Sequence, residues 1–309
     1  MGNVPPLTTP LVLRTLRKAV WEKIRLDPTA SMLDVDELIS FGCKIDRRYM
    51  LSQPTLTISP REWARTIALA EQRVTGTPVQ LLTGKTQFYG LSLAVRRGVL
   101  LPRPETEQLV ETVLDWTHER VGTRPMTILE LGIGSGAIGL SLAHHRPTAT
   151  IIGWDISRRA VTLAQRNQSQ LGITNCQFLE GDFFKEKVRW ESLAKEKKQV
   201  ILVSNPPYIP TSVLPTLDLS VQQNDPKRAL DGGATGLRFH RKLIHLAAQY
   251  RWPLFLEIGY DQTMSIQRIG KQLNMEPTII YDYSNNPRIA IITTTNTPRF
   301  GEFPSGPAK

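Results

Sequence analysis

Residues 127–136 read TILELGIGSG, and this stretch decides the fold class that the sequence predicts. A mostly apolar run leads directly into Gly132, Gly134 and Gly136. The apolar run is typical of a buried strand, whereas residues 137–145 continue with helical spacing. Glycines between a strand and a helix let the backbone approach a ligand closely, and they leave N–H groups free at the helix N-terminus. The stretch therefore predicts a strand, a ligand-binding loop and a helix.

The chain from residue 104 to 293 alternates between strand-like and helix-like segments. We expect strands at 127–131, 150–154, 176–179, 200–204, 253–258, 278–282 and 288–293, and helices at 105–119, 137–145, 157–171, 236–250 and 261–273. Such alternation predicts a parallel sheet covered on both faces. The last two strands are separated only by residues 284–287, so they must be antiparallel. We therefore expect an α/β fold with a Rossmann-like sheet that ends in an antiparallel hairpin, as in class I methyltransferases.

Residues 1–85 differ from the rest, because their apolar residues recur at helical spacing. They predict a small helical-bundle domain, in which Ser59 and Pro60 start one helix as N-cap and N1 residues. Strand-like residues lie on both sides of Arg96-Arg97-Gly98, so residues 86–103 are expected to form a β-hairpin linker. Residues 294–309, rich in Thr, Pro and Gly, are expected to be a flexible tail.

Composition excludes several classes of protein. The chain has 309 residues, of which 40% are hydrophobic and 21% charged, so it is not collagen, a coiled coil or a disordered protein. No apolar run approaches the roughly 18 residues of a spanning helix, so no membrane association is expected. Two distant cysteines, Cys43 and Cys176, exclude a disulfide scaffold, and the five histidines show no metal-site spacing.

The charge bears on partners and compartment. Lys and Arg number 38 against 28 Asp and Glu, a net charge of +10 that suits a polyanionic partner or the mitochondrial matrix. Residues 1–21 contain no acidic side chain, which fits either a mitochondrial targeting peptide or simply a first helix. A targeting peptide cleaved there would cut into the helical bundle. We expect the mitochondrial matrix, with the bacterial cytoplasm as the alternative.

The glycine loop and Asp155 together predict a nucleoside site. Asp155 ends the next strand, where a carboxylate can accept hydrogen bonds from both hydroxyls of a ribose. Gly134, Gly136 and Gly139 also satisfy the dinucleotide fingerprint GxGxxG. The additional Gly132, preceded by Glu130, favours S-adenosylmethionine, whose carboxylate could use the same N–H groups.

Asn205-Pro206-Pro207-Tyr208 directly follows the apolar segment 200–203 and is the strongest signal in the chain. Two prolines restrict the backbone, so the segment should form a rigid arm at the carboxyl end of a strand, where such sheets bind ligands. The Asn205 side-chain oxygen and the Pro206 carbonyl could accept both N–H bonds of a planar NH₂ group, with Tyr208 against its flat face. The arm thus predicts methyl transfer to an amide or adenine nitrogen, with catalysis by positioning rather than by a base.

Further motifs narrow this prediction to one family. Residues 100–107 (LLPRPETE), 78–84 (PVQLLTG) and 228–237 (RALDGGATGL) accompany the glycine loop and the Asn205 arm in the order seen in the HemK/PrmC family of release-factor glutamine methyltransferases. The chain resembles that family over about residues 10–293, more loosely over 28–60.

The resemblance implies methylation of the glutamine amide in the Gly-Gly-Gln motif of peptide-chain release factors, with S-adenosylmethionine as cofactor. It implies a catalytic role for Asn205, Pro206 and Tyr208, which with Pro207 would bind the substrate amide. Arg103, Glu105 and Thr106 would help to close the pocket, and the helical domain would dock the release factor. The cofactor would be held by Gly132, Ile133, Gly134, Ser135, Gly136, Asp155, Asp182, Phe183 and Asn205.

Other functions stay open at this point. The arm also suits an adenine-N methyltransferase on DNA or RNA, although the sequence shows no target-recognition domain or dense basic face. Glutamine methylation of a ribosomal protein would use the same chemistry. A non-catalytic ribosome-associated protein and a dehydrogenase fit the motifs less well. We expect a monomer whose partner is the release factor and which meets nucleic acid only indirectly, through the ribosome or that factor.

Overall fold

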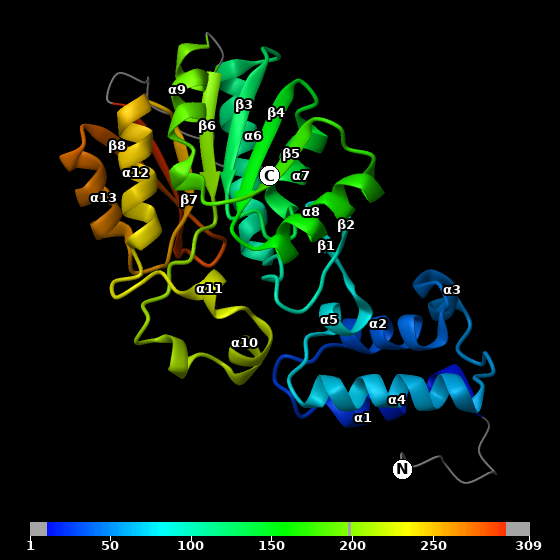
Figure 1. Cartoon of the computed structure of the whole chain (residues 1–309). Coiled ribbons are helices and arrows are strands. Elements are labelled where there is room, and N and C mark those ends of the chain that lie inside the picture. Colours follow the sequence, from blue (N-terminus) through cyan, green and yellow to red (C-terminus); the bar gives the residue numbers. More distant parts are fainter. Residues whose placement is uncertain (1–10, 197–198, 295–309) are drawn as a thin grey trace, which may run out of the picture. The chain divides into compact units, whose positions relative to one another are not determined.

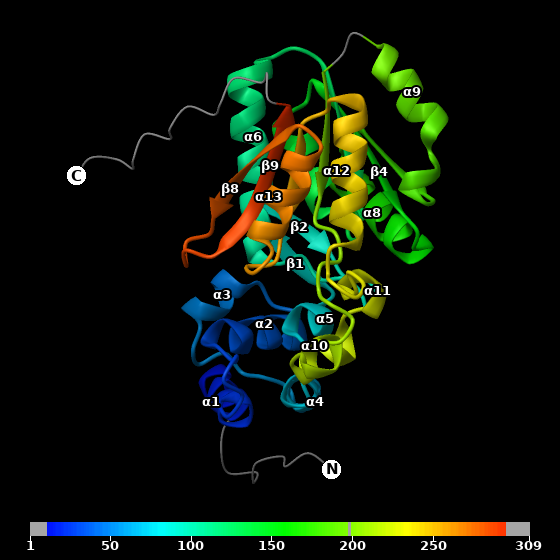
Figure 2. The same ribbon diagram turned by 90° about the vertical axis from the view of Figure 1, so that its left-hand side faces the viewer.

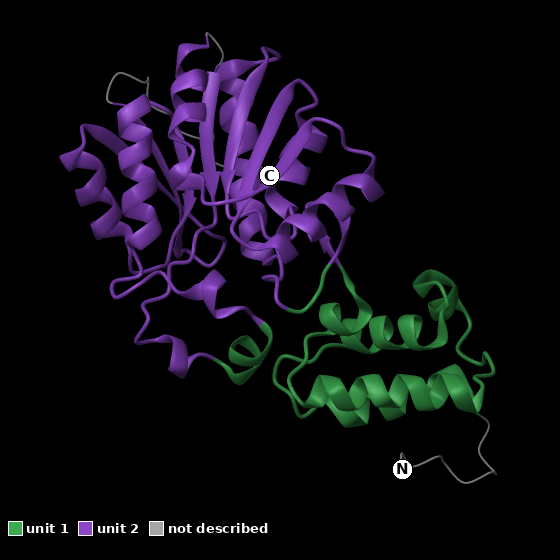
Figure 3. Ribbon diagram, in the orientation of Figure 1, with its two compact units in different colours: residues 1–85, 95–97, 218–224 green, residues 86–94, 98–217, 225–309 purple. Residues whose placement is uncertain are grey.

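The computed structural model describes residues 11–196 and 199–294. Contacts divide the chain into two compact units, coloured separately in Figure 3: residues 1–85, 95–97 and 218–224 form unit 1, and residues 86–94, 98–217 and 225–309 form unit 2. The first ten residues and the predicted tail from 295 onward lie outside the described residues. Among the helices that are described, none has the length and apolarity needed to cross a membrane.

Unit 1 is the predicted helical bundle. Its core consists of apolar side chains that the helical spacing brings to one face of each helix, such as Leu16, Val20 and Leu38. Ser59 caps a helix as expected, and its partner Glu62 completes a capping box. The helices are α1 (Leu13–Ile24), α2 (Met32–Cys43), α3 (Arg47–Ser52), α4 (Pro60–Val74) and α5 (Val79–Thr83) (Figure 1). Since α1 begins at Leu13 and is buried in this core, residues 13–24 form part of the fold itself.

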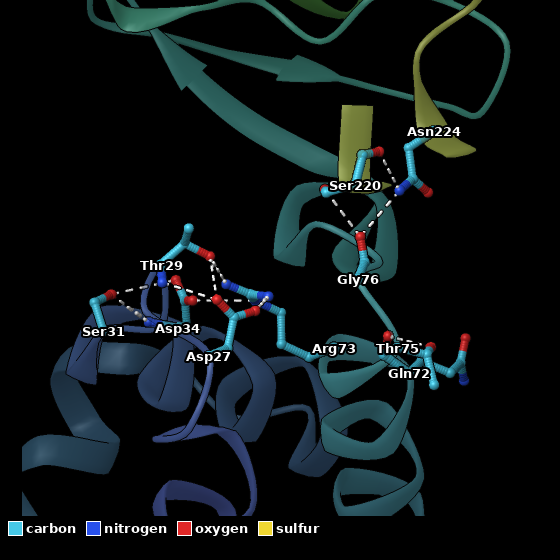
Figure 4. Close-up of polar contacts among 10 residues, drawn as sticks. All are labelled: Asp27, Thr29, Ser31, Asp34, Gln72, Arg73, Thr75, Gly76, Ser220 and Asn224. Atoms are coloured by element: carbon cyan, nitrogen blue, oxygen red, sulfur yellow. Dashed lines mark hydrogen bonds and ion pairs between the residues drawn. The ribbon is translucent and has the colours of Figure 1, made fainter. Parts of the chain in front are cut away.

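Partly buried polar contacts hold the end of α4 and the turn after it in unit 1 (Figure 4). The Arg73 guanidinium forms ion pairs with Asp27 (2.5 Å) and Asp34 (3.2 Å). The Gly76 carbonyl accepts hydrogen bonds from Ser220 Oγ and Asn224 Nδ2, both at 3.0 Å. Those two residues belong to α10 (Leu219–Asn224), so a segment far along the chain completes unit 1.

The predicted hairpin is present, but its turn lies elsewhere. β1 (Lys85–Phe88) and β2 (Leu91–Ala94) are joined by Tyr89 and Gly90, with φ of 46° and 77°, instead of turning at Arg96-Arg97-Gly98. Positive φ at both central residues is the geometry that favours a two-residue hairpin turn. We expected the hairpin to link two domains. Instead, residues 86–94 belong to unit 2, and Phe88, Leu91 and Leu93 are buried in its core.

Unit 2 contains a seven-stranded sheet with the order β5-β4-β3-β6-β7-β9-β8. Neighbouring strands from β5 to β7 are parallel, and β9 runs antiparallel to both β7 and β8. The strands are β3 (Met126–Leu131), β4 (Ala149–Asp155), β5 (Cys176–Glu180), β6 (Gln199–Ser204), β7 (Leu254–Glu257), β8 (Met275–Tyr281) and β9 (Pro287–Thr294). The predicted α/β fold with an antiparallel final hairpin is confirmed.

Helices cover both faces of this sheet, as Figures 1 and 2 show. Alternate residues of one strand enter different cores: Ile201 packs with one group of helices and Leu202 with the other. The first group is α6 (Glu107–Val121), α7 (Ala137–His145) and α8 (Arg158–Leu171), and the second is α9 (Lys187–Lys195), α12 (Arg238–Tyr250) and α13 (Thr263–Gln272). Since both faces are covered, ligands have access to the sheet at its carboxyl edge.

Candidate active site

A cavity of about 860 Å³, its open mouth included, lies in unit 2 at the carboxyl ends of β3, β4 and β6. It brings together the glycine loop, Asp155 and the first three residues of the Asn205 arm, which the sequence placed in one site. Its lining residues are Gly98, Val99, Leu100, Leu131, Gly132, Gly134, Trp154, Asp155, Ile156, Ser157, Ala160, Gly181, Asp182, Phe183, Phe184, Asn205, Pro206, Pro207, Pro226, Arg228, Ala229 and Phe239.

The glycine loop contributes backbone to the cavity. Gly132 and Gly134 have φ of 74° and 54°, and a Cβ atom on either would meet no protein atom within 4 Å. Positive φ and open space in front of the loop fit a ligand that lies against the main chain. The other three predicted residues do not line the cavity: Ile133 and Ser135 are buried, and Gly136 caps α7 where a Cβ would approach Ala164 to 3.0 Å.

Asp155 is held by the backbone around it. Its Oδ2 accepts a hydrogen bond from the Gly134 N–H at 3.1 Å, and its Oδ1 accepts one from the Ser157 N–H at 2.8 Å. Burial, which is the largest influence, raises the pKa of this carboxyl above its ordinary value, although both backbone bonds lower it. Each carboxylate oxygen has a second lone pair, so the oriented group can still accept two hydroxyl hydrogens. These residues therefore fit a ribose.

The aromatic residues after β5 divide between core and cavity. Phe183 borders the cavity but is only 1% exposed, because its ring packs against Trp154 and Trp190 at centroid distances of 5.4 and 4.6 Å. Phe184 is less buried and carries the Lys242 ammonium 4.9 Å from its ring centroid. Asp182, which also lines the cavity, accepts the Phe184 N–H and so fixes this turn. Phe183, which we expected beside the cofactor, and Phe184 therefore both border the cavity, and Phe184 is the less buried of the two.

The Asn205 arm is fixed at both ends. Asn205 Nδ2 donates to Thr106 Oγ1 at 3.1 Å. The carbonyl of Tyr208 accepts from Gln262 Nε2 at 2.9 Å. Tyr208 itself does not line the cavity, and burial raises the pKa of its phenol to about 12. The neutral phenol can therefore act as a hydrogen-bond donor throughout the physiological pH range.

The predicted pocket loop has a different place. Arg103, Glu105 and Thr106 do not line the cavity. Arg103 instead forms an ion pair with Asp225, and Thr106 faces the buried carboxylate of Glu257. The residues of this region that reach the cavity come slightly earlier, at Val99 and Leu100.

Comparisons with known proteins agree with this geometry. A family described as a methyltransferase domain matches residues 123–214, and one described as the PrmC N-terminal domain matches residues 29–84. A release factor glutamine methyltransferase of Moorella thermoacetica is 35% identical over 285 residues, which cover 89% of this chain and 96% of that protein. The chain belongs to the release factor glutamine methyltransferase family.

Other similarities are consistent with this assignment. The release factor glutamine methyltransferase of Thermodesulfovibrio yellowstonii is 37% identical over 242 residues, 77% of this chain and 83% of that protein. Among solved structures, the hMettl16 catalytic domain in complex with MAT2A 3'UTR hairpin 6 has a TM-score of 0.52 at 12% identity, covering 79% and 85% of the two chains. That last likeness concerns the fold alone.

Several cavity residues of this family member were absent from the sequence-based prediction. Pro226, Arg228 and Ala229 close one side, and two of them belong to the segment 228–237 that carried the family resemblance without a role. Leu131, Trp154, Ile156, Ala160 and Phe239 are apolar, and nothing in the sequence distinguishes them from core residues. No group of three potential metal-ligating side chains occurs among the described residues.

Proposed function

We propose that this chain transfers a methyl group from S-adenosylmethionine to the side-chain amide nitrogen of the glutamine in the Gly-Gly-Gln motif of a peptide-chain release factor. The observation that carries the proposal is that Asn205 and Pro206 line the same cavity as Gly134 and Asp155. The names of the Moorella and Thermodesulfovibrio relatives support the substrate.

The residues around the glycine loop fit the cofactor. Gly132 and Gly134 would let its amino acid part lie against the backbone, and Asp155 would accept the ribose hydroxyls. Phe183 and Phe184, with Asp182, would border its adenine. Bound there, S-adenosylmethionine supplies an electrophilic methyl group.

The residues of the arm act on the acceptor. An amide nitrogen is a weak nucleophile, because its lone pair is delocalised into the carbonyl group. Asn205 Oδ1 and the Pro206 carbonyl would accept its two N–H bonds and hold the nitrogen in the geometry for attack. Such positioning can contribute roughly 7–11 kcal/mol in favourable cases. Pro206 and Pro207 stiffen the arm, and Gln262 anchors its far end, so the acceptors stay in place before substrate arrives.

The remaining elements of the proposal concern the partner. Unit 1 would dock the release factor, and its match to the PrmC N-terminal domain supports this role. The enzyme would act as a monomer and would meet nucleic acid only through the release factor or the ribosome.

For the compartment, the relatives named above come from bacteria and so support the bacterial cytoplasm over the mitochondrial matrix.

The test is mass spectrometry of a release factor incubated with the protein and S-adenosylmethionine. We expect one added methyl group on the glutamine of the Gly-Gly-Gln peptide, absent with Asn205→Ala. If methyl groups appear instead on a ribosomal protein, DNA or RNA in parallel reactions, the substrate assignment is overturned, while the cofactor assignment stands.

A further inference from the structure

Three side chains from distant parts of unit 2 form a buried chain of hydrogen bonds beside the cavity. Asn205 Nδ2 donates to Thr106 Oγ1 at 3.1 Å, and Thr106 Oγ1 donates to Glu257 Oε2 at 2.7 Å. Thr106 is 4% exposed and Glu257 is 2% exposed. Thr106 lies at the start of α6, Asn205 follows β6 and Glu257 ends β7, so only the folded sheet brings the three together.

The direction of each bond follows from the groups involved. An amide nitrogen only donates, so the Thr106 oxygen must accept from Asn205. The single hydroxyl hydrogen of Thr106 is then given to the carboxylate of Glu257, which as an anion only accepts. Although Thr106 occupies the N-cap position of α6, its side chain makes no capping bond. Its hydroxyl therefore accepts from Asn205 and donates to Glu257.

This arrangement fixes which atom of Asn205 is offered to a ligand. A side-chain amide has its oxygen and nitrogen on opposite sides, and exchanging them reverses its hydrogen-bonding character. With Nδ2 bound to Thr106, Oδ1 is left to accept. If the amide turned over, it would present N–H bonds to a substrate NH₂ group that can itself only donate.

We infer that Thr106 and Glu257 are positioning residues that hold Asn205 with its amide oxygen toward the methyl-accepting nitrogen. This inference rests on the proposed function, since it deepens the role of Asn205 there. It extends the acceptor site beyond the contiguous arm 205–208 to two side chains that touch neither the cavity nor the substrate.

The protonation state of Glu257 determines the direction of the hydrogen bonds between Asn205, Thr106 and Glu257. A protonated Glu257 could donate to Thr106, whose hydroxyl would then be free to donate to Asn205 Oδ1 and favour the reversed amide. Burial is the largest influence on this carboxyl and raises its pKa to about 7. Thr106, Tyr208 and Arg288 lower the pKa, whereas Glu105 raises it further. His240 bonds the Glu257 carbonyl, and burial lowers the pKa of that imidazole to about 4, so it is neutral where Glu257 titrates.

The first test compares Thr106→Val with Thr106→Ser. Valine keeps the shape but removes both bonds, whereas serine keeps the hydroxyl. We expect Thr106→Val to lower kcat on a Gly-Gly-Gln peptide by roughly 10- to 100-fold. The Kd for S-adenosylmethionine should be unchanged, and Thr106→Ser should recover most of the rate. Thr112→Val is the matched control, because Thr112 is likewise a buried threonine but lies inside α6 and donates its hydroxyl to the Gln108 carbonyl.

The second test is the pH profile. In the wild type, kcat should rise as pH increases through about 7 and Glu257 ionises. Glu257→Gln should give a low rate without this step, since glutamine does not titrate and can present either polarity to Thr106. A profile with the same step in Glu257→Gln would assign the titration to another group and overturn the role of Glu257.

A third readout needs no turnover. In protein labelled with ¹⁵N-asparagine, the side-chain NH₂ signal of Asn205, identified by its loss in Asn205→Ala, should exchange slowly with solvent. Thr106→Val should accelerate that exchange, whereas Thr112→Val should not. Unchanged exchange in Thr106→Val would refute the positioning role. Inactivity of the wild type on release factors would instead count against the proposed function alone, and the exchange measurement would still test the positioning role.

Discussion

The two halves of the cavity are built differently. The cofactor half, which we define as Gly132, Gly134 and Asp155, comes from the ends of two neighbouring strands and is held by backbone N–H groups. The acceptor half, which we define as Asn205, Thr106 and Glu257, is held by side chains separated by up to 151 positions in sequence. The cofactor half, made from two consecutive strands and the glycine loop after the first, leaves a pattern over a short stretch of sequence. The acceptor half, made from side-chain bonds across the sheet, does not.

The difference also concerns electrostatics. Asp155 meets two backbone donors, which lower the pKa of its carboxyl against the larger effect of burial. Glu257 is buried on all sides and titrates near pH 7, so the acceptor half has a charge state that solution conditions can change. Variants in the two halves should therefore separate binding from turnover.

The largest effect is expected at the centre of the acceptor half. Asn205→Ala removes an acceptor of the substrate NH₂ group, and loss of one such preorganised contact costs roughly 100- to 1000-fold in kcat. The Kd for S-adenosylmethionine, measured by calorimetry, should hardly change. A variant with nearly normal turnover would overturn the role of Asn205 in the acceptor half.

The cofactor half should respond in the opposite way. Asp155→Ala removes the acceptors of two ribose hydroxyls, each a charge-assisted bond of roughly 1.5–3 kcal/mol. We expect the Kd for S-adenosylmethionine to rise by about 100-fold or more, with a smaller loss in Asp155→Asn, which keeps one acceptor oxygen. An unaltered Kd in calorimetry would remove Asp155 from the cofactor half.

Folding stability should reveal the titration of the acceptor half. Between pH 4.5 and about 7, folded Glu257 keeps a proton that the unfolded chain has released, so the contribution of Glu257 to the free energy of unfolding falls as pH rises through this range. Glutamine does not titrate, so the stability of Glu257→Gln relative to wild type should increase by about 3 kcal/mol across it. His240 titrates in both proteins and cancels from the difference. Urea unfolding at several pH values measures this difference, and a difference independent of pH would contradict the assignment.

The smallest effect is expected for Phe184, a cavity side chain next to the cofactor half. Phe184→Ala removes one flat wall of the cavity, while the backbone contacts and Asp155 are retained. Aromatic contacts of this kind contribute about 0.5–1.5 kcal/mol, so the cofactor Kd should rise by roughly 2- to 10-fold with kcat preserved. A loss as large as that of Asp155→Ala would mean that the aromatic contact contributes as much to cofactor binding as the Asp155 carboxylate.

Local patterns predicted much of the fold, but they failed where contacts are non-local. The strand–helix alternation located every strand of the seven-stranded sheet, because apolar periodicity depends on neighbours in sequence. The hairpin turn was missed, since Tyr89 adopts a φ of 46° that the residue type does not suggest. The place of α10 in unit 1 was missed as well, because it depends on two hydrogen bonds to Gly76, far away in sequence.

The sequence by itself determined the α/β class, the glycine loop and the Asn205 arm, because local apolar periodicity and the backbone preferences of Gly and Pro suffice for each. It also placed Asp155 at the end of the next strand. Only the tertiary structure decided that Phe184 joins Phe183 at the cavity while Phe183 is almost fully buried, and that Thr106 of the pocket loop bonds Glu257. The physical reason is that burial and hydrogen-bond partners depend on which strands become neighbours. Thr106, Asn205 and Glu257 carry no common pattern until β6 and β7 pair in the sheet.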